Sequence, residues 1–177
     1  MLRMTLIFRT FQTLEHFDQQ AIRWISRRRT PALDFMMRVF TRTGNWQSWT
    51  ALGVAGLLAG GTSRALVVSI APRLILTFMI CLGIKRISKR PRPNQTLQSF
   101  STLLKNPDPY SFPSSHTACA WVSCVSLGME LGWGWPLWVG HAAAISYSRV
   151  HVGAHYPLDV LMGMLIGFSL AALLYSP

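Results

Sequence analysis

Acidic residues are scarce in this chain of 177 residues, and so is charge in general. It has 6 Asp and Glu against 17 Lys and Arg, a formal net charge of +11, and only 13% of its residues are charged. Half of the residues are hydrophobic. This composition excludes a disordered chain and an ordinary soluble domain with a polar shell, so a membrane is the expected environment. The positive surplus indicates an anionic partner such as nucleic acid, anionic lipid or phosphate.

Cysteine is also scarce and forms no recognisable motif. Cys81, Cys119 and Cys124 lie inside apolar stretches, without a Cys-x-x-Cys pair or a histidine at zinc spacing, so neither a disulfide framework nor a structural zinc site is expected. The first ten residues lack the small-residue cleavage site of a secretory signal peptide, and we expect them to remain on the chain. The sequence contains no internal repeat, and its length predicts one domain, or at most one and a half.

Long apolar stretches dominate the chain after Gly44. Five of them are predicted to span a membrane: residues 46–60, 65–84, 115–131, 135–148 and 157–175. The first and the fourth are short against the roughly 17 to 25 residues that a span needs, which predicts thin or tilted helices. The sequence therefore predicts an all-α integral membrane bundle of five helices, residues 45–177, after an N-terminal segment, residues 1–44.

The N-terminal segment shows the apolar stripe of an amphipathic helix over residues 10–29, and residues 31–42 repeat it in shorter form. Two placements fit the first helix. It either lies in the headgroup region, with Arg27, Arg28 and Arg29 near lipid phosphates, or packs on the rest of the protein with its polar face in water. Both remain open, and we carry the interfacial helix forward as the prediction.

Five spans place the polar segments with unusual residues on one side of the membrane. One of them begins with Lys85-x6-Arg92-Pro93, which on its own also fits a positively charged collar at the end of a span. It leads to Pro113-Ser114-Ser115-His116 at the predicted start of the third span. His116 there lies in a first helical turn, where free backbone N–H groups and the helix dipole attract an anion.

A further segment, Ser148-Arg149-x5-His155-x3-Asp159, leads into the fifth span. Pro157 suits a first helical turn, so His155 is expected in a loop and Asp159 in the turn behind it. This geometry predicts that Asp159 accepts the Nδ1–H of His155 and leaves Nε2 as a nucleophile. Three cations, two histidines and one carboxylate on the same face suit the charged oxygens of a phosphate monoester.

With these motifs the chain resembles the type 2 phosphatidic acid phosphatases, also called lipid phosphate phosphatases, whose signature is K-x6-RP, PSGH and SR-x5-H-x3-D. The resemblance covers residues 85–159 by motif. It implies a phosphatase without metal or other cofactor, in which His155 forms a phosphohistidine, Asp159 orients it and His116 protonates the leaving oxygen. The residues implied to hold the phosphoryl oxygens are Lys85, Arg92, Ser114, Ser115 and Arg149.

The chain departs from the signature at Ser115, which takes the place of the glycine in PSGH. Because Ser115 should already be helical, we expect no backbone strain there. His151 and His141 are interpreted as a polar loop residue and a core residue rather than as catalytic groups. A zinc site remains an alternative, but the three cations aimed at the same place argue against it; its ligands would be His116, His151, His155 and Asp159.

Arg73 lies in the middle of the second predicted span, where an unpaired charge is expensive. At about 1.5 Å per residue it lies roughly 18 Å from Lys85, and Glu130 lies roughly 21 Å from His116. If Lys85 and His116 meet at one phosphate, the two charges have about the same depth. We therefore predict a structural ion pair between Arg73 and Glu130.

The predicted function is hydrolysis of a lipid phosphate or lipid diphosphate, such as phosphatidic acid, phosphatidylglycerol phosphate, undecaprenyl diphosphate or lipid A phosphate. Two alternatives remain: a phosphotransferase that uses the same histidine, and a non-catalytic membrane protein that binds anionic lipid. The expected partners are the substrate and membrane lipids, with Arg86, Lys89 and Arg90 attracting headgroups, and not nucleic acid. The sequence predicts no oligomeric state.

Two observations about sidedness disagree. The side with the motifs carries 15 of the 17 Lys and Arg residues, which by the positive-inside rule favours the cytoplasm. Bacterial members of the family that the chain resembles usually act on the outer side of the inner membrane. We follow the resemblance and expect an inner-membrane protein with an outward-facing site.

Overall fold

The computed structural model describes residues 2–98, 100–106 and 108–175, and of residues 2–12 the backbone alone. Within these residues it contains helices and no strand. The helices are α1 (Leu2–Ser26), α2 (Pro31–Thr43), α3 (Trp46–Ala59), α4 (Gly61–Ser88), α5 (Pro93–Thr96), α6 (Ser115–Leu131), α7 (Trp135–His151) and α8 (Pro157–Leu173). The all-α prediction is confirmed.

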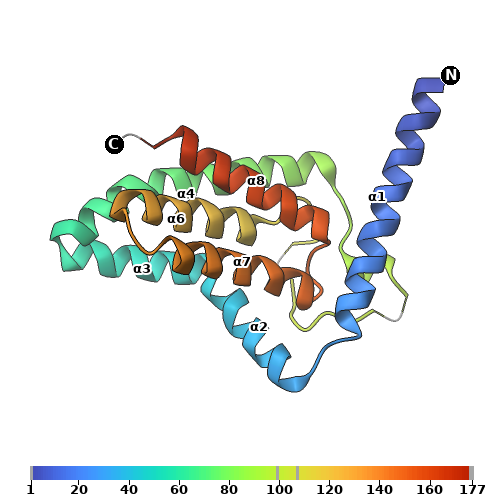
Figure 1. Ribbon diagram of the computed structural model, residues 1–177, viewed down its shortest axis with the longest axis horizontal. Helices are drawn as coiled ribbons and strands as arrows, with labels where there is room; N and C mark the ends of the chain where they lie inside the picture. The colour runs from blue at the N-terminus through green and yellow to red at the C-terminus, as the bar shows by residue number, and fades with distance from the viewer. Residues whose placement is uncertain (1, 99, 107, 176–177) are drawn as a thin grey trace.

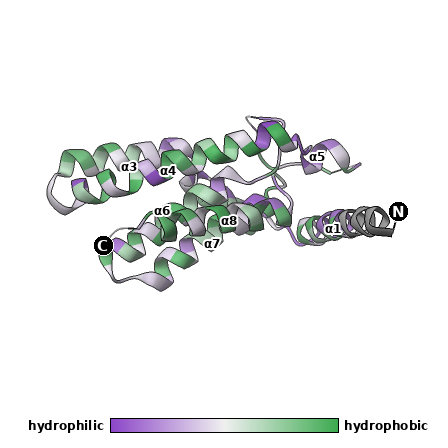
Figure 2. Ribbon diagram, turned by 90° about the horizontal axis from the view of Figure 1, so that it is seen from above, coloured by the Kyte–Doolittle hydropathy of each residue, from purple (hydrophilic) through white to green (hydrophobic). Residues whose placement is uncertain are grey.

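The five predicted spans correspond to α3, α4, α6, α7 and α8, which lie side by side in one bundle (Figure 1). The central helix is α6, which packs against α4, α7 and α8. Glycines in α8 allow this close packing, because a Cβ at Gly163 would lie 2.5 Å from the carbonyl oxygen of Ser114, and one at Gly167 would meet that of Ala118. Hydrophobic residues run along the bundle helices, and hydrophilic ones gather at α5 and the adjoining end of α4 (Figure 2).

The bundle helices differ in length. Among the described residues, α4 with its 28 residues is the one helix long and apolar enough to cross a membrane by length and composition, and α8 is apolar but shorter. The other four bundle helices have 14 or 17 residues. At 1.5 Å per residue they reach about 21 to 26 Å, less than the roughly 30 Å of a hydrocarbon core. Short spans were expected only for the first and the fourth: α3 is short as predicted, whereas α7 has the same 17 residues as α6 and α8.

The N-terminal helices lie at one end of the bundle. α2 packs against α7 and α3, while α1 meets the bundle through α7 and α8. α1 runs steeply across the direction of the bundle helices, and its N-terminal part projects beyond them (Figure 1). α1 begins at Leu2, eight residues before the predicted start. α2 runs one residue further than predicted, from Pro31, with Thr30 as its N-cap.

The ion pair predicted within the bundle is present. Arg73 Nη1 in α4 donates to Glu130 Oε1 in α6 at 3.1 Å, and Ser69 Oγ donates to the same oxygen at 2.5 Å. The pair therefore ties α4 to α6 away from the residues of the candidate site. A buried arginine with a carboxylate partner avoids the cost of an isolated charge among apolar helices.

Candidate active site

One cavity of about 750 Å³ brings the three motifs together. Its apolar part lies between α3 and α4, where Trp49, Leu57, Val67, Leu74 and Phe78 are among the lining residues. Its polar end is lined by residues from α4, α6, α7 and the two loops beside them, namely Lys85, Arg92, Asp108, Ser115, His116, Arg149 and His155. Residues that are far apart in the sequence therefore converge as predicted.

His155 lies in the loop between α7 and α8, as expected, and is 1% exposed. Its predicted hydrogen bond to Asp159 is wrong. Nδ1 of His155 lies 2.7 Å from the carbonyl oxygen of Ser111 but 3.7 Å from Asp159 Oδ2. The carboxylate of Asp159 has other donors, since Oδ1 accepts from Arg90 Nη1 at 2.6 Å and Oδ2 from the backbone N–H of Tyr156 at 2.9 Å.

The neighbours of His155 determine which of its ring nitrogens carries the proton. A carbonyl oxygen only accepts, so Nδ1, which faces Ser111, must be the protonated nitrogen. A guanidinium only donates, and Nη1 of Arg92 lies 3.4 Å from Nε2, which therefore presents its lone pair. Burial and then the charges of Arg149, Arg92 and Lys85 hold the pKa of His155 well below its ordinary value. The ring is therefore a neutral base with an unprotonated Nε2.

Arg92 and Lys85 hold a carboxylate that the sequence did not assign to the site. Arg92 Nη2 donates to Asp108 Oδ1 at 2.9 Å, and Lys85 Nζ donates to the same oxygen at 3.2 Å. Lys85 also donates to the carbonyl oxygen of Tyr110 at 2.9 Å. Burial opposes the charged form of Asp108, but the charges of Lys85 and Arg92 outweigh it and lower the pKa of this carboxyl. Asp108 is thus an anion between two of the predicted phosphate ligands.

Arg149 keeps part of its guanidinium free. Its Nη1 donates to Thr41 Oγ1 of α2 at 2.8 Å, while its buried Nε has no hydrogen-bond partner among the described residues. Ser148 Oγ donates to the carbonyl oxygen of Ile145 and also lies 3.0 Å from Thr41 Oγ1. Thr41 therefore orients Arg149, and a phosphoryl oxygen is a suitable acceptor for the free N–H.

The two serines that open α6 have different positions. Ser114 is fully buried, and its Oγ accepts hydrogen bonds from Thr117, so it acts as the N-cap and is not among the cavity-lining residues. Ser115 lines the cavity, and its buried Oγ has no partner among the described residues. Its backbone is not left-handed, because Lys89 is the one non-glycine residue in the described chain with a positive φ. The serine in the glycine position is unstrained, as expected.

We predicted that Arg90 attracts lipid headgroups, but its guanidinium pairs with carboxylates within the protein. Its guanidinium bridges two fully buried carboxylates, with Nη1 2.6 Å from Asp159 and Nη2 2.7 Å from Asp18 of α1. Asp18 Oδ1 also accepts the backbone N–H of Leu158, in the first turn of α8. Burial raises the pKa of Asp18 although the bonds from Arg90 and Leu158 oppose it. Arg90 therefore joins α1 to the start of α8, behind His155.

The remaining histidines lie apart from the cavity lining, as predicted for His151 and His141. His151 is nevertheless the last residue of α7 and not the loop residue that we predicted. His151 is fully buried, with Nε2 2.7 Å from Asp34 Oδ1, and His141 Nε2 lies 3.4 Å from Thr43 Oγ1. Among the described residues, no three His, Cys, Asp or Glu side chains are grouped so that they could hold a metal ion. The proposed alternative zinc ligands therefore do not form such a group there.

His116 has a partner at the start of α3. Its Nε2 lies 2.7 Å from Oδ1 of Asn45, the residue before α3. The sequence motifs do not include Asn45, Thr41, Asp18 or Asp108, and single-residue patterns gave no signal for the first two. The two aspartates had one signal, because carboxylates are scarce in so basic a chain, and a carboxylate that is removed from water requires a cationic partner.

An apolar cavity with a neutral histidine and several cations at its end, in a helical membrane bundle, defines an enzyme of the lipid phosphate hydrolase class. The family model described as the PAP2 superfamily matches residues 49–176, and the chain belongs to this superfamily. The resemblance found in the sequence motifs is thereby confirmed.

Curated relatives with sequence similarity include two lipid-linked phosphatases. An undecaprenyl-diphosphatase of Sulfolobus acidocaldarius is 28% identical over 156 residues, which cover 85% of this chain and 73% of the relative. A decaprenylphosphoryl-5-phosphoribose phosphatase of Mycobacterium tuberculosis is 27% identical over 128 residues, which cover 72% of this chain and 70% of the relative. Both matches extend over most of the bundle.

Solved structures share the fold. LpxE of Aquifex aeolicus has a TM-score of 0.75 and 26% identity, covering 88% of this chain and 92% of that one. A transmembrane PAP2-type phosphatidylglycerolphosphate phosphatase of Bacillus subtilis has a TM-score of 0.71 and 21% identity, covering 92% and 84%. The second likeness concerns the fold alone. Together these matches place the chain among membrane phosphatases of this architecture.

Proposed function

We propose that this protein hydrolyses a lipid phosphate or lipid diphosphate in two steps through a phosphohistidine. In the first step the lone pair of His155 Nε2 forms a bond to phosphorus, the bond to the leaving oxygen breaks, and His116 donates a proton to that oxygen. In the second step water attacks the phosphohistidine and releases inorganic phosphate. His116, which gave up its proton, takes one from the attacking water.

The observation that supports this most is the state of His155. Its Nε2 is unprotonated and lines the same cavity as Lys85, Arg92 and Arg149. Three cations beside one nucleophile match the three equatorial oxygens of a phosphoryl group in transfer, where catalysis depends on position and charge neutralisation. Fixed cations supply this neutralisation, and we therefore expect the activity to persist without a metal ion.

The apolar part of the cavity supports a lipid substrate. It extends from the cations along α3 and α4, past Trp49, Leu74 and Phe78. Large apolar side chains of the same helices that do not line the cavity, such as Leu58 and Val68, are exposed. A tail can therefore remain among lipids while the headgroup meets the cations. The named activities of the two curated relatives support polyprenyl phosphates and diphosphates as the first substrates to test.

The test is a panel assay of purified protein in detergent with a chelator present. The panel contains undecaprenyl diphosphate, phosphatidic acid, phosphatidylglycerol phosphate and lipid A phosphate, and free phosphate is scored. We expect release from at least one of them, loss of turnover in His155→Gln, and retained activity in His141→Gln, because His141 lies outside the cavity lining. Full activity of His155→Gln, or activity that requires a metal, would contradict the proposal.

The same assay separates hydrolysis from transfer. Quenching with a phosphorus-labelled substrate should trap an acid-labile phosphoprotein in the wild type and none in His155→Gln. If the label passes to a second lipid and not to free phosphate, the enzyme is a phosphotransferase. Free phosphate as the main product supports the hydrolase.

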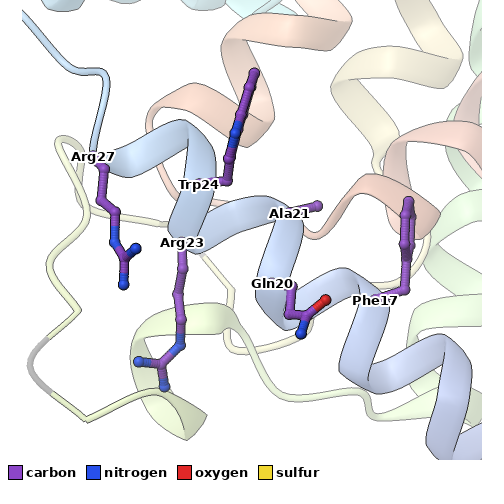
Figure 3. A pocket seen from close by; sticks show the side chains of 6 residues that line it. All are labelled: Phe17, Gln20, Ala21, Arg23, Trp24 and Arg27. Atoms are coloured by element: carbon purple, nitrogen blue, oxygen red, sulfur yellow. The ribbon is translucent and has the colours of Figure 1, made fainter.

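We also propose that α1 lies in the membrane interface. In Figure 3 the side chains of Phe17 and Trp24 point to one side of the helix, and those of Arg23 and Arg27 point to the other. A helix that runs across the bundle direction at its end lies along the membrane plane if the bundle spans the bilayer. In vesicles, Phe17→Cys should resist a water-soluble thiol reagent that labels Arg23→Cys. Equal labelling would contradict this placement.

For the sidedness we propose an outward-facing site in the inner membrane. Some positive residues on this side already have partners within the protein, since Arg90 pairs with two carboxylates and Arg29 donates to the carbonyl oxygen of His151 at 2.6 Å. These charges weigh less in the positive-inside count. The exposed Lys105 allows a direct test, because Lys105→Cys should react with a membrane-impermeant reagent in intact cells. Labelling only after permeabilisation would reverse the assignment.

A further inference from the structure

The side chain of Asn45 does not cap the helix that it precedes. It is the N-cap of α3, with φ −72° and ψ 153°, where an asparagine side chain ordinarily accepts a hydrogen bond from the first helical turn. No such capping bond is present. Instead Oδ1 of Asn45 lies 2.7 Å from Nε2 of His116, which is 71 positions away in the chain. Oδ1 of Asn45 therefore accepts from the histidine and leaves the first turn of α3 without a side-chain cap.

This contact determines how the proton of His116 is delivered. An amide oxygen accepts and never donates, so the Nε2 that it binds carries a hydrogen in both the neutral and the charged ring. The proton that His116 gives up must then leave from Nδ1. Nδ1 has no hydrogen-bond partner among the described residues, and the ring lines the cavity that holds His155.

We infer that Asn45 is a positioning residue for the acid step. It holds the ring of His116 by Nε2 and so directs the Nδ1 proton toward the leaving oxygen. Asn45 lies outside residues 49–176, which match the family model, so the family signature does not account for it. The inference rests on the proposed function, in which His116 is the proton donor.

A leaving-group comparison tests this role. An alkoxide leaving group needs a proton as its bond to phosphorus breaks, whereas p-nitrophenolate leaves as a stable anion. General acid catalysis contributes about 10² to 10⁴-fold, and a ring that has lost its positioning partner should retain part of it. We expect Asn45→Ala to lower kcat on dioctanoyl phosphatidic acid about 10- to 100-fold. On p-nitrophenyl phosphate the same variant should stay within about 3-fold of the wild type.

Two further variants serve as controls. Asn45→Asp keeps an acceptor oxygen and should restore most of the activity on phosphatidic acid. Gln47→Ala changes an exposed side chain of the same helix and should leave both activities as they are. Equal losses of Asn45→Ala on both substrates would show a merely structural role and overturn the inference, as would an unchanged rate on phosphatidic acid.

A double-mutant cycle shows whether Asn45 acts through His116. In a His116→Ala background, Asn45→Ala should change kcat on phosphatidic acid less than about 2-fold, because the residue that it positions is gone. Losses that multiply would overturn the inference while leaving the proposed hydrolase intact. A wild-type protein that releases phosphate from none of the four lipids of the panel would instead refute the proposed function, and with it this role.

Discussion

Asp108 occupies the place where we expect a phosphoryl oxygen to bind. One carboxylate oxygen accepts from both Arg92, at 2.9 Å, and Lys85, at 3.2 Å. Both cations are buried, with 3% and 5% of their surface exposed, and buried cations need a counter-ion. The carboxylate meets this need while the substrate is absent. A phosphate that enters the cavity must displace it, and we therefore expect Asp108 to weaken the binding of every phosphate-like ligand.

The substitution Asp108→Asn removes the charge and keeps the shape. Hydrogen bonds to charged groups contribute about 1.5 to 3 kcal/mol each. The Asp108 side chain is 39% exposed, so solvent screening reduces its two bonds to about 1.5 kcal/mol in total. A competing interaction of about 1.5 kcal/mol weakens the binding of a phosphate-like ligand about 10-fold. We expect the inhibition constants of vanadate and inorganic phosphate to fall about 10-fold in Asp108→Asn, and its melting temperature to fall as well.

The assay is competitive inhibition of phosphatidic acid hydrolysis, with a thermal melt of each variant. Asp34→Asn is the matched control, because Asp34 pairs with His151 outside the cavity lining and its loss should leave both inhibition constants unchanged. Unchanged or weaker inhibition in Asp108→Asn would show that the carboxylate does not compete with phosphate. A melting temperature that does not fall would refute its role as counter-ion.

Three smaller predictions concern other parts of the site. Thr41→Val should lower kcat/KM about 10-fold, because Arg149 loses a hydrogen bond worth about 1.5 kcal/mol, and Thr41→Ser should restore it. Ser115→Gly should lower kcat/KM about 5-fold by removing a free hydroxyl from the cavity, without the gain in melting temperature that relief of backbone strain would give. We expect the ring of His155 to remain neutral as the pH falls through 6.5. NMR of labelled histidine measures this, and the His155→Gln variant assigns the signal. A titration midpoint at or above 6.5 would contradict the lowered pKa.

Local sequence patterns were sufficient for much of the architecture. The predicted span 115–131 coincides with α6, because Ser114 as N-cap and Gly132 as a left-handed C-cap are local signals. The ion pair between Arg73 and Glu130 followed from helix rise and the cost of an isolated charge. The convergence of the motifs at one cavity followed from the number of spans, which puts their loops on one side.

The spacing of the motifs could not predict hydrogen bonds between residues that are far apart in the sequence. Asp159 has the right offset from His155, but whether its carboxylate bonds to the imidazole depends on which other donors reach it. Arg90, 69 positions earlier, takes one oxygen, and the backbone N–H of Tyr156 takes the other. A backbone carbonyl, that of Ser111, then accepts from the histidine, and every residue type offers one. The tautomer was predicted correctly although its cause was not.

The scarcity of acidic residues turns out to be informative about individual positions. Five of the six Asp and Glu side chains pair with a cationic or histidine side chain. In a chain with a net charge of +11 the free cations far outnumber the carboxylates, so an acid buried among apolar helices is retained where a particular cation must be held. Asp18 meets this description. Asp108 is a loop residue whose side chain is 39% exposed, but it also holds two buried cations. The rarity of such residues is a reason to examine them before a structure is known.

The N-terminal helices contribute more to the site than their place outside the matched family region suggests. Asp18 of α1 pairs with Arg90, and Thr41 of α2 accepts from Arg149. Both partners lie in the catalytic motifs or beside them, and both are charges that need compensation within the protein. Asn45 adds the contact to His116. The division at residue 44 that the composition suggested therefore does not separate the residues of the candidate site, because Arg90 and Arg149 are oriented by residues from the other side of that division.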